Sequence, residues 1–295
     1  MNAPLPEKKI DLFTSYFTAR YETPCVGSDL TLGINEGSFH ARQLRLGGLT
    51  YFAPEVCVAN GDSYVEKNLR APERHLRIIS VLSFLSGAGI MLDIGSNIGL
   101  TSVPRAMMRQ FTHIHAFEPE PKNFACLQAS VEANGLGNRM TAWNLAVGAA
   151  TSSGWIRLRS GMARHDMATL ADNDTVACGV TSLDAWMEEQ GVPPEDIRFV
   201  KVDVQGFEAN VLHGASKILQ LGKAVWQLEA TPVLLERYGT PQEKFVALLK
   251  EHFSWFCDME NIRLGFRPIL ELQPGLGLTD RKFTDLILFR SPSLN

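Results

Sequence analysis

The strongest constraint on the fold is a regular alternation of short apolar runs with segments of helical spacing, which continues to the end of the chain. Strands are predicted at Ile90–Ile94, His113–Phe117, Met140–Val147, Trp155–Arg159, Phe199–Val204, Ala224–Glu229, Phe253–Cys257 and Asp285–Phe289. Helices are predicted at Glu73–Leu85, Leu100–Arg109, Asn123–Ala133, Ser182–Gln190, Ala209–Leu219 and Pro241–His252. This alternation is typical of an α/β fold, a mostly parallel sheet with helices on both faces. Ligands of such sheets bind beyond the carboxyl ends of the strands, so functional residues are expected there.

Composition excludes several classes of protein. The 295 residues carry 28 basic and 32 acidic side chains, a formal charge of −4, which gives no electrostatic reason to expect a nucleic-acid partner. The five cysteines are far apart and form no C-x-x-C pair, so neither a disulfide framework nor a zinc site is predicted. The most apolar stretch, Ile78–Ile94, is broken by serines, glycines and Asp93, and no signal peptide is recognisable. We therefore expect a soluble cytoplasmic protein without a membrane span.

Residues 1–70 follow a different pattern from the rest of the chain. Their apolar runs, such as Leu44–Leu49 and Tyr51–Val58, are short and interrupted by glycine and proline, which indicates short strands and turns. The sequence therefore predicts an N-terminal extension at 1–70, followed by a single α/β domain at 71–295.

The first predicted strand of the alternation runs into a glycine-containing loop, MLDIGSNIGLTS. A dinucleotide-binding loop would read G-x-G-x-x-G and place a diphosphate at the helix N-terminus. Here Asp93 precedes the first glycine by two residues, and Asn97 takes the place of the second glycine. An acid at this point repels a diphosphate but suits an ammonium group or a hydroxyl donor, as S-adenosylmethionine provides. The candidate cofactor-binding residues of the loop are Asp93, Gly95, Ser96, Asn97 and Gly99. The alternative is a tight structural turn, for which glycine is also suited.

Two later strand ends support the same ligand. Glu118 ends the second strand, and a carboxylate there can accept hydrogen bonds from both ribose hydroxyls. In the segment AWNLAVG, Asn144 could hydrogen-bond the adenine base and the backbone of Ala146 could contact it. For Glu118 the alternative is a solvated surface acid.

Four segments, DIGSNIG, FEPEPKN, NLAVG and KVDVQGFEANVLHGA, together resemble the FkbM family of S-adenosylmethionine-dependent methyltransferases. The resemblance covers about Met91–Glu229. It implies a class I methyltransferase fold, Rossmann-like with a seven-stranded sheet, and O-methylation of a hydroxyl on a sugar, glycolipid or secondary metabolite. The residues that match the family's cofactor loop are Asp93, Gly95, Asn97 and Gly99, and Glu118 matches its ribose-binding acid. One departure is Gln205, where the family commonly has Glu in K-x-D-x-E-G, and it weakens a catalytic role for this position.

Methyl transfer to a neutral alcohol needs a base for the alcohol proton, and a general base contributes about 10²–10⁴-fold to the rate. Asp203 ends the fourth strand, next to where the methyl group should lie, and Glu229 ends the neighbouring fifth strand. The pair suits a base with its orienting partner, or a magnesium or calcium site, because hard cations prefer oxygen ligands. We assign no metal and leave a divalent ion on Asp203 and Glu229 open.

His165 is the best histidine candidate for a base. It lies in the irregular stretch SGMARHDMA, and such loops often cover active sites, although an exposed loop histidine is the alternative. Residues 1–70 lie outside the resemblance. We expect them to form a lid or an oligomer contact, because the methyltransferase core leaves the acceptor pocket open, and a homo-oligomer follows from the second of these roles.

Three competing functions remain. A nicotinamide oxidoreductase needs a phosphate-binding glycine loop, which the Asp93 and Asn97 pattern does not provide. A methyltransferase acting on a macromolecule is disfavoured by the negative charge and by the absence of an N-P-P-Y motif. A catalytically silent subunit that binds S-adenosylmethionine as a scaffold is compatible with the same sequence.

Overall fold

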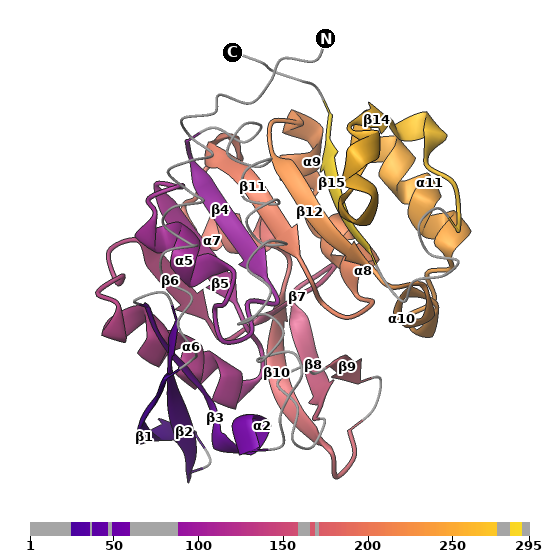
Figure 1. Ribbon diagram of the computed structural model, residues 1–295. Helices are drawn as coiled ribbons and strands as arrows, with labels where there is room; N and C mark the ends of the chain where they lie inside the picture. The colour runs from indigo at the N-terminus through magenta and orange to yellow at the C-terminus, as the bar shows by residue number, and fades with distance from the viewer. Residues whose placement is uncertain are drawn as a thin grey trace.

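The structure is a computed structural model that describes residues 25–35, 37–46, 49–59, 88–158, 166–168, 171–275 and 284–290 (Figure 1). The predicted helix Glu73–Leu85, the predicted domain boundary at residue 70 and the candidate base His165 lie outside these residues. The described part of the chain contains one large sheet, two smaller sheets and helices on both faces of the large sheet.

Within the described residues the large sheet has eight strands in the order β14-β13-β15-β12-β11-β4-β5-β6. Their bounds are β4 (Ile90–Ile94), β5 (His113–Phe117), β6 (Met140–Trp143), β11 (Ile197–Val202), β12 (Val225–Ala230), β13 (Trp255–Asp258), β14 (Arg267–Pro268) and β15 (Thr284–Phe289). The five strands from β12 to β6 are parallel, and β15 is antiparallel to both of its neighbours, β12 and β13. The seven expected strands are confirmed, and β14 adds a two-residue edge strand. The strand order reverses between β4 and β11, which is where a ligand is expected.

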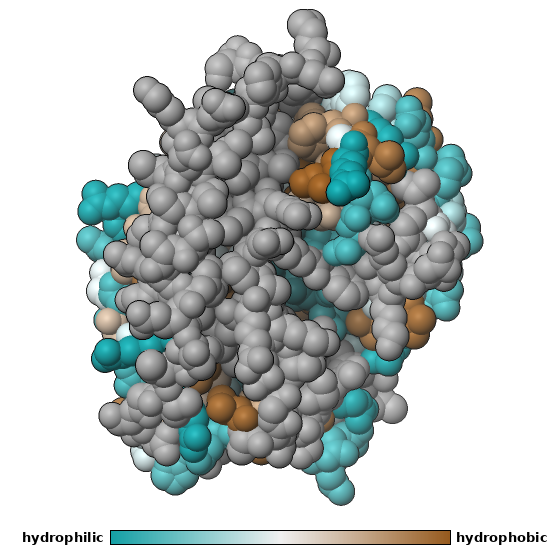
Figure 2. Space-filling model, in the orientation of Figure 1, coloured by the Kyte–Doolittle hydropathy of each residue, from teal (hydrophilic) through white to brown (hydrophobic). Residues whose placement is uncertain are grey.

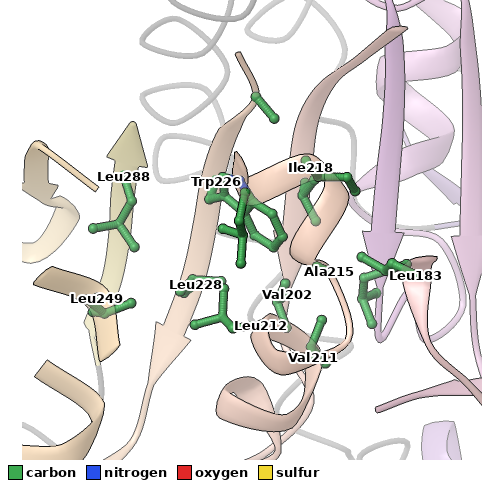
Figure 3. Close-up of a cluster of buried hydrophobic side chains, with 14 of the residues drawn as sticks. Leu183, Val202, Val211, Leu212, Ala215, Ile218, Trp226, Leu228, Leu249 and Leu288 are labelled. Carbon is green, nitrogen blue, oxygen red and sulfur yellow. The ribbon is translucent and has the colours of Figure 1, made fainter. Parts of the chain in front are cut away.

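Two apolar cores cover the two faces of this sheet. The first packs α5 (Ser102–Met107) and α6 (Pro121–Ala133) on one face. The second packs α7 (Leu183–Gln190), α8 (Glu208–His213), α9 (Ser216–Leu221), α10 (Pro232–Arg237) and α11 (Gln242–His252) on the other. Figure 3 shows the second core, in which Trp226 and Leu228 of β12 face Leu212 and Ile218. Burying each such side chain contributes about 1.5–3 kcal/mol to the stability of the fold. Because helices pack on both faces of the sheet, the predicted two-sided packing is confirmed.

A four-stranded sheet, in the order β7-β10-β8-β9, lies beyond the carboxyl ends of the central strands (Figure 1). Its strands are β7 (Ala146–Val147), β8 (Ser152–Arg157), β9 (Asp166–Ala168) and β10 (Thr175–Thr181). The prediction of one strand over Met140–Val147 was therefore wrong. The chain leaves the large sheet after Trp143, and Ala146 and Val147 pair with β10 instead. The strand β10 was not predicted.

The predicted helix Ala209–Leu219 is divided into α8 and α9 at Gly214. A methyl group on Gly214 would lie 2.1 Å from the carbonyl oxygen of Gly148, so the small sheet packs against the helix at this point. The described residues also form short 3-10 helices, which are η1 (Pro194–Asp196), η2 (Met259–Leu264) and η3 (Ile269–Glu271).

The N-terminal residues form a sheet beside α6 (Figure 1), with β1 (Cys25–Ile34), β2 (Gly37–Leu46), β3 (Leu49–Pro54) and the helix α2 (Glu55–Ala59). The backbone amide of Phe52 donates to Ser130 Oγ at 3.0 Å. The side-chain amide of Asn134 exchanges two hydrogen bonds with the backbone of Thr50. Tyr51 and Phe52 are buried in the same core as α6. Within the apolar run Tyr51–Val58 the strand ends at Pro54, as a short strand interrupted by proline predicts, and the helix α2, which was not predicted, follows.

No helix in the described part of the chain is long and apolar enough to cross a membrane. Apolar surface gathers on one face near β14 (Figure 2), where Leu264, Phe266 and Leu270 are exposed. The expected homo-oligomer stays a prediction, and so do the lid and oligomer-contact roles of the N-terminal extension.

Candidate active site

The loop after β4 uses its backbone amides within the chain. The amides of Gly95 and Ser96 both donate to the carbonyl oxygen of Phe117, at 3.0 and 2.9 Å. The amide of Asn97 donates to Glu118 Oε2 at 2.8 Å. A diphosphate-binding loop directs such amides at the ligand instead. The loop is therefore a poor site for a diphosphate, and the carboxylate of Glu118 lies beside it.

The glycines of this loop are required by the protein's own contacts. Gly95 has φ +79°, and a Cβ there would lie 2.0 Å from the backbone oxygen of Asp203. Gly99 has φ +88°, and its Cβ would lie 2.7 Å from Leu127 Cδ1 of α6. Asn97 also has a positive φ, of 53°, which asparagine tolerates better than most residues. Both glycines are thus required by contacts with the backbone after β11 and with α6.

Glu118 points inward, toward the loop. Its side chain accepts hydrogen bonds from the backbone amides of Asn97 and Glu120, at 2.8 and 3.0 Å, and only 6% of the residue is exposed. Burial raises the pKa of this carboxyl to about 8, although the hydrogen bonds from the backbone amides of Glu120 and Asn97 act in the opposite direction. A solvated surface acid, the alternative considered for Glu118, does not match this position.

Asn144 and Ala146 lie where β6 ends. The side-chain amide of Asn144 donates to the carbonyl oxygens of Glu118 and Pro119, at 2.9 and 3.0 Å. Ala146 is buried in β7, opposite Val180. Asn144 therefore joins the ends of two neighbouring strands, and the contacts of both residues with an adenine base remain predictions.

A buried lysine connects the cofactor loop with the predicted catalytic carboxylate. Lys201 lies opposite Asp93 in the register of β11 and β4, and its Nζ is 3.3 Å from Asp93 Oδ1 and 3.7 Å from Asp203 Oδ2. Asp93 is fully buried. The ammonium group next to its carboxylate is that of Lys201, a residue of the same chain. Sequence reasoning missed Lys201. The available signal was a charged residue two positions before Asp203, between the apolar residues Val200 and Val202.

Glu229 lies in a crowded acidic environment near the end of β12. It is directly opposite Asp285 of the antiparallel strand β15, and Gln227 Nε2 donates to Asp285 Oδ1 at 3.3 Å. Burial raises the pKa of Glu229 well above its ordinary value, and the negative charge of Asp203 is the next contribution. These surroundings therefore favour the protonated form of Glu229.

The structure brings the predicted catalytic pair together through a residue that was assigned no role. Gln205 Nε2 donates to Asp203 Oδ1 at 3.0 Å and to Glu229 Oε2 at 2.9 Å. No group of three or more metal-ligating side chains occurs among the described residues. A divalent ion on Asp203 and Glu229 stays a prediction that a chelator titration tests.

Glu208 holds the turn that carries Gln205. Its Oε1 accepts hydrogen bonds from the backbone amides of Val204 and Gly206, at 3.1 and 3.2 Å. Burial raises the pKa of Glu208 to about 7. The side chain is committed to the backbone of the turn, which is a structural role.

The topological switch between β4 and β11, the antiparallel strand β15 between β12 and β13, and the carboxylates at the strand ends together define a class I S-adenosylmethionine-dependent methyltransferase. The sequence model described as "Methyltransferase FkbM domain" matches residues 93–268, more than half of the chain. The chain belongs to this family, as its motifs predicted.

Among curated proteins, the hexuronic acid methyltransferase AglP of Haloferax volcanii is 30% identical over 156 residues, which are 52% of this chain and 60% of that protein. The chain thus matches less than two thirds of this relative's length. Solved structures with a similar arrangement include P. horikoshii TYW2 in complex with MeSAdo, at 13% identity and a TM-score of 0.41, covering 84% of this chain and 70% of that one. M. jannaschii TYW2 in complex with AdoMet has 13% identity and a TM-score of 0.39, covering 87% and 88%. Likeness at this level says nothing about the reaction.

Proposed function

We propose that the protein is an O-methyltransferase that acts on a hydroxyl of a sugar, a glycolipid or a secondary metabolite. The observation that carries the proposal is the pairing of Asp203 and Glu229 at adjacent strand ends. This pair adjoins the cofactor loop, since Gly95 lies against the backbone of Asp203. The name of the relative, a hexuronic acid methyltransferase, supports a sugar as the acceptor.

The donor side of the proposed site is rich in hydrogen-bond acceptors. The Glu118 carboxyl accepts hydrogen bonds from two backbone amides and from the side chain of Asn123, and because its two oxygens together offer about four lone-pair positions, it retains capacity for a ribose hydroxyl. Asp93, Gly95, Ser96, Asn97 and Gly99 form the loop beside it, with Asn144 and Ala146 proposed near the base. S-adenosylmethionine supplies a methyl group on a sulfonium, a good leaving group.

On the acceptor side, Asp203 is the proposed base. Its side chain is 25% exposed and has the ammonium of Lys201 at 3.7 Å, which favours the ionised form. As the acceptor oxygen forms its bond to the methyl carbon, the hydroxyl proton passes to Asp203. The carbon–sulfur bond breaks and its electron pair stays on sulfur. Glu229 orients the acceptor by hydrogen bonding.

For the chain outside this site, we propose an N-terminal extension at 1–70 and a methyltransferase domain at 71–295. The extension is proposed to act as a lid or as a contact between copies of the chain. Leu30 on β1 is an exposed apolar side chain of this sheet. Leu30→Lys should therefore change the acceptor KM or the sedimentation coefficient, and no change in either would contradict both roles.

The test is transfer of a labelled methyl group from S-adenosylmethionine to a panel of acceptors. The panel contains neutral hexosides, hexuronic acid glycosides, hydroxylated metabolites, tRNA and protein, with and without a chelator. Methyl label on a hydroxyl oxygen of a small acceptor supports the proposal, and loss of label with chelator shows that a metal is needed. Label on tRNA or protein alone overturns it, and binding of S-adenosylmethionine without any transfer identifies a scaffold subunit.

A further inference from the structure

The turn between β11 and α8 holds Gln205 in a conformation that side chains rarely adopt. Gln205 has φ +56° and the following Gly206 has φ +104°. A Cβ on Gly206 would lie 2.4 Å from the backbone oxygen of Leu234, so α10 fixes the path of the turn. Glu208 binds the backbone amides on both sides of Gln205. Such left-handed positions at residues other than glycine cost on the order of 1–3 kcal/mol and cluster at functional sites.

The side-chain amide nitrogen of Gln205 donates hydrogen bonds to two carboxyl groups. The NH₂ group has two hydrogens, and one acceptor is available for each, Asp203 Oδ1 at 3.0 Å and Glu229 Oε2 at 2.9 Å. A glutamate at position 205, which the family commonly has, would bring a third carboxyl to the same point. It could act as a donor only while it carries a proton.

We propose that Gln205 is a positioning residue for methyl transfer, whose neutral amide holds Asp203 and Glu229 side by side. This proposal rests on the proposed function of the pair. The charged groups that surround the pair among the described residues are Asp93, Lys201, Glu208 and Asp285. Only one of these four is a cation, so a further negative charge beside the pair would add to an acidic cluster. The amide holds Asp203 in place without adding charge.

The test uses the full chain and two substitutions that keep an unbranched side chain at the strained position. Gln205→Glu keeps the length and adds a titratable group, whereas Gln205→Met keeps the length and removes every hydrogen bond. Gln220→Glu, on the exposed surface of α9, controls for the added charge. Thermal unfolding is followed from pH 5 to pH 8 for the four proteins, and the Kd for S-adenosylmethionine is measured on the same samples.

At pH 5 a protonated glutamate can still donate, so the Tm of Gln205→Glu should lie within about 2 °C of the wild type. At pH 8 the third negative charge should lower the Tm of Gln205→Glu, relative to the wild type, by about 4–8 °C more than at pH 5. Gln205→Met should lower the Tm at both pH values, and Gln220→Glu at neither. With the acceptor found by the methyl-transfer screen, kcat of Gln205→Met should fall about tenfold or more while Kd for S-adenosylmethionine stays within about twofold.

The proposal is overturned if Gln205→Glu lowers the Tm equally at pH 5 and pH 8, or lowers it at neither pH. A residue that only fills space would show no dependence of this Tm difference on pH. Full kcat in Gln205→Met also overturns it. Failure of the wild type to bind S-adenosylmethionine would instead contradict the proposed function and leave the pH pattern of unfolding as it is. The two failures are therefore distinguishable.

Discussion

Gly95 lies so close to Asp203 that a methyl group on its Cα would stand 2.0 Å from the Asp203 carbonyl oxygen. Asp203 in turn donates its backbone amide to Ile94 at 3.0 Å. Two backbone contacts therefore position the loop that follows β4 against the residue that carries the carboxylate after β11. Donor and acceptor sides of the proposed reaction cannot shift independently at this point.

Gly95→Ala should be strongly destabilising, because both its positive φ and the Asp203 backbone oppose a Cβ. We expect a loss of about 3 kcal/mol or more in the free energy of unfolding. Gly135→Ala is a matched control, since Gly135 has φ +64° with nothing within 4 Å of its Cβ position. It should cost only about 1 kcal/mol. Urea titration of both variants measures the difference, and equal losses would refute the contact.

Lys201→Met should remove the cation beside Asp93, whose side chain is fully buried. Breaking a buried ion pair from one side typically costs about 3–5 kcal/mol. The double variant Lys201→Met with Asp93→Asn should recover part of this loss, because the remaining partner is then neutral. Denaturant unfolding of the three variants forms the cycle. Additive losses would show that the two residues do not interact.

Glu118 should make ribose binding depend on pH. Its carboxyl has a pKa of about 8 in the free protein, and the ionised form accepts two ribose hydroxyls better than the protonated form. Affinity for 5′-methylthioadenosine, which has no amino acid group to titrate, should therefore rise with pH, by up to about tenfold per unit below pH 8. Calorimetry from pH 6 to pH 9 measures this, and Glu118→Gln should remove the dependence. A flat profile in the wild type would show that Glu118 does not bind the ribose.

His115 should make the fold sensitive to acid. It is packed against His113, Trp143 and Trp186, and burial lowers its pKa to about 4, from about 6.5 in the unfolded chain. Between these values the unfolded chain binds more protons, so the free energy of unfolding falls as pH decreases from 6.5 to 4, by about 2 kcal/mol. His115→Gln should flatten this slope in denaturant titrations. The exposed control His213→Gln should not, and an unchanged slope in His115→Gln would assign the acid sensitivity to other groups.

The sequence predicted the parts of the fold that local pattern determines. Ile90–Ile94 and His113–Phe117 are strands with the predicted bounds, because both are short buried runs ended by an acid and a glycine or proline turn. Tertiary contacts decided the rest. The strand predicted through Val147 stops at Trp143, and the helix predicted through Gly214 is interrupted, in both cases where the small sheet meets the domain.

Some residues of the candidate site could likewise be predicted from the sequence, whereas others required the structure. Asp203 and Glu229 could be predicted as neighbours because carboxyl ends of parallel strands meet at one edge. Lys201 and Gln205 could not be assigned, since their roles depend on strand register and on a left-handed turn that no local motif specifies. The departure from the family at Gln205 was visible in the sequence, but its meaning required the two hydrogen bonds to be seen.

The central claim is that Asp203 takes the proton of an acceptor hydroxyl while the methyl group is transferred. Single-turnover transfer from labelled S-adenosylmethionine, compared between the wild type and Asp203→Asn, tests it most directly. We predict that Asp203→Asn slows transfer to the hydroxyl by about 10²–10⁴-fold, with Kd for S-adenosylmethionine within about threefold of the wild type. Transfer at the wild-type rate by Asp203→Asn would contradict the account.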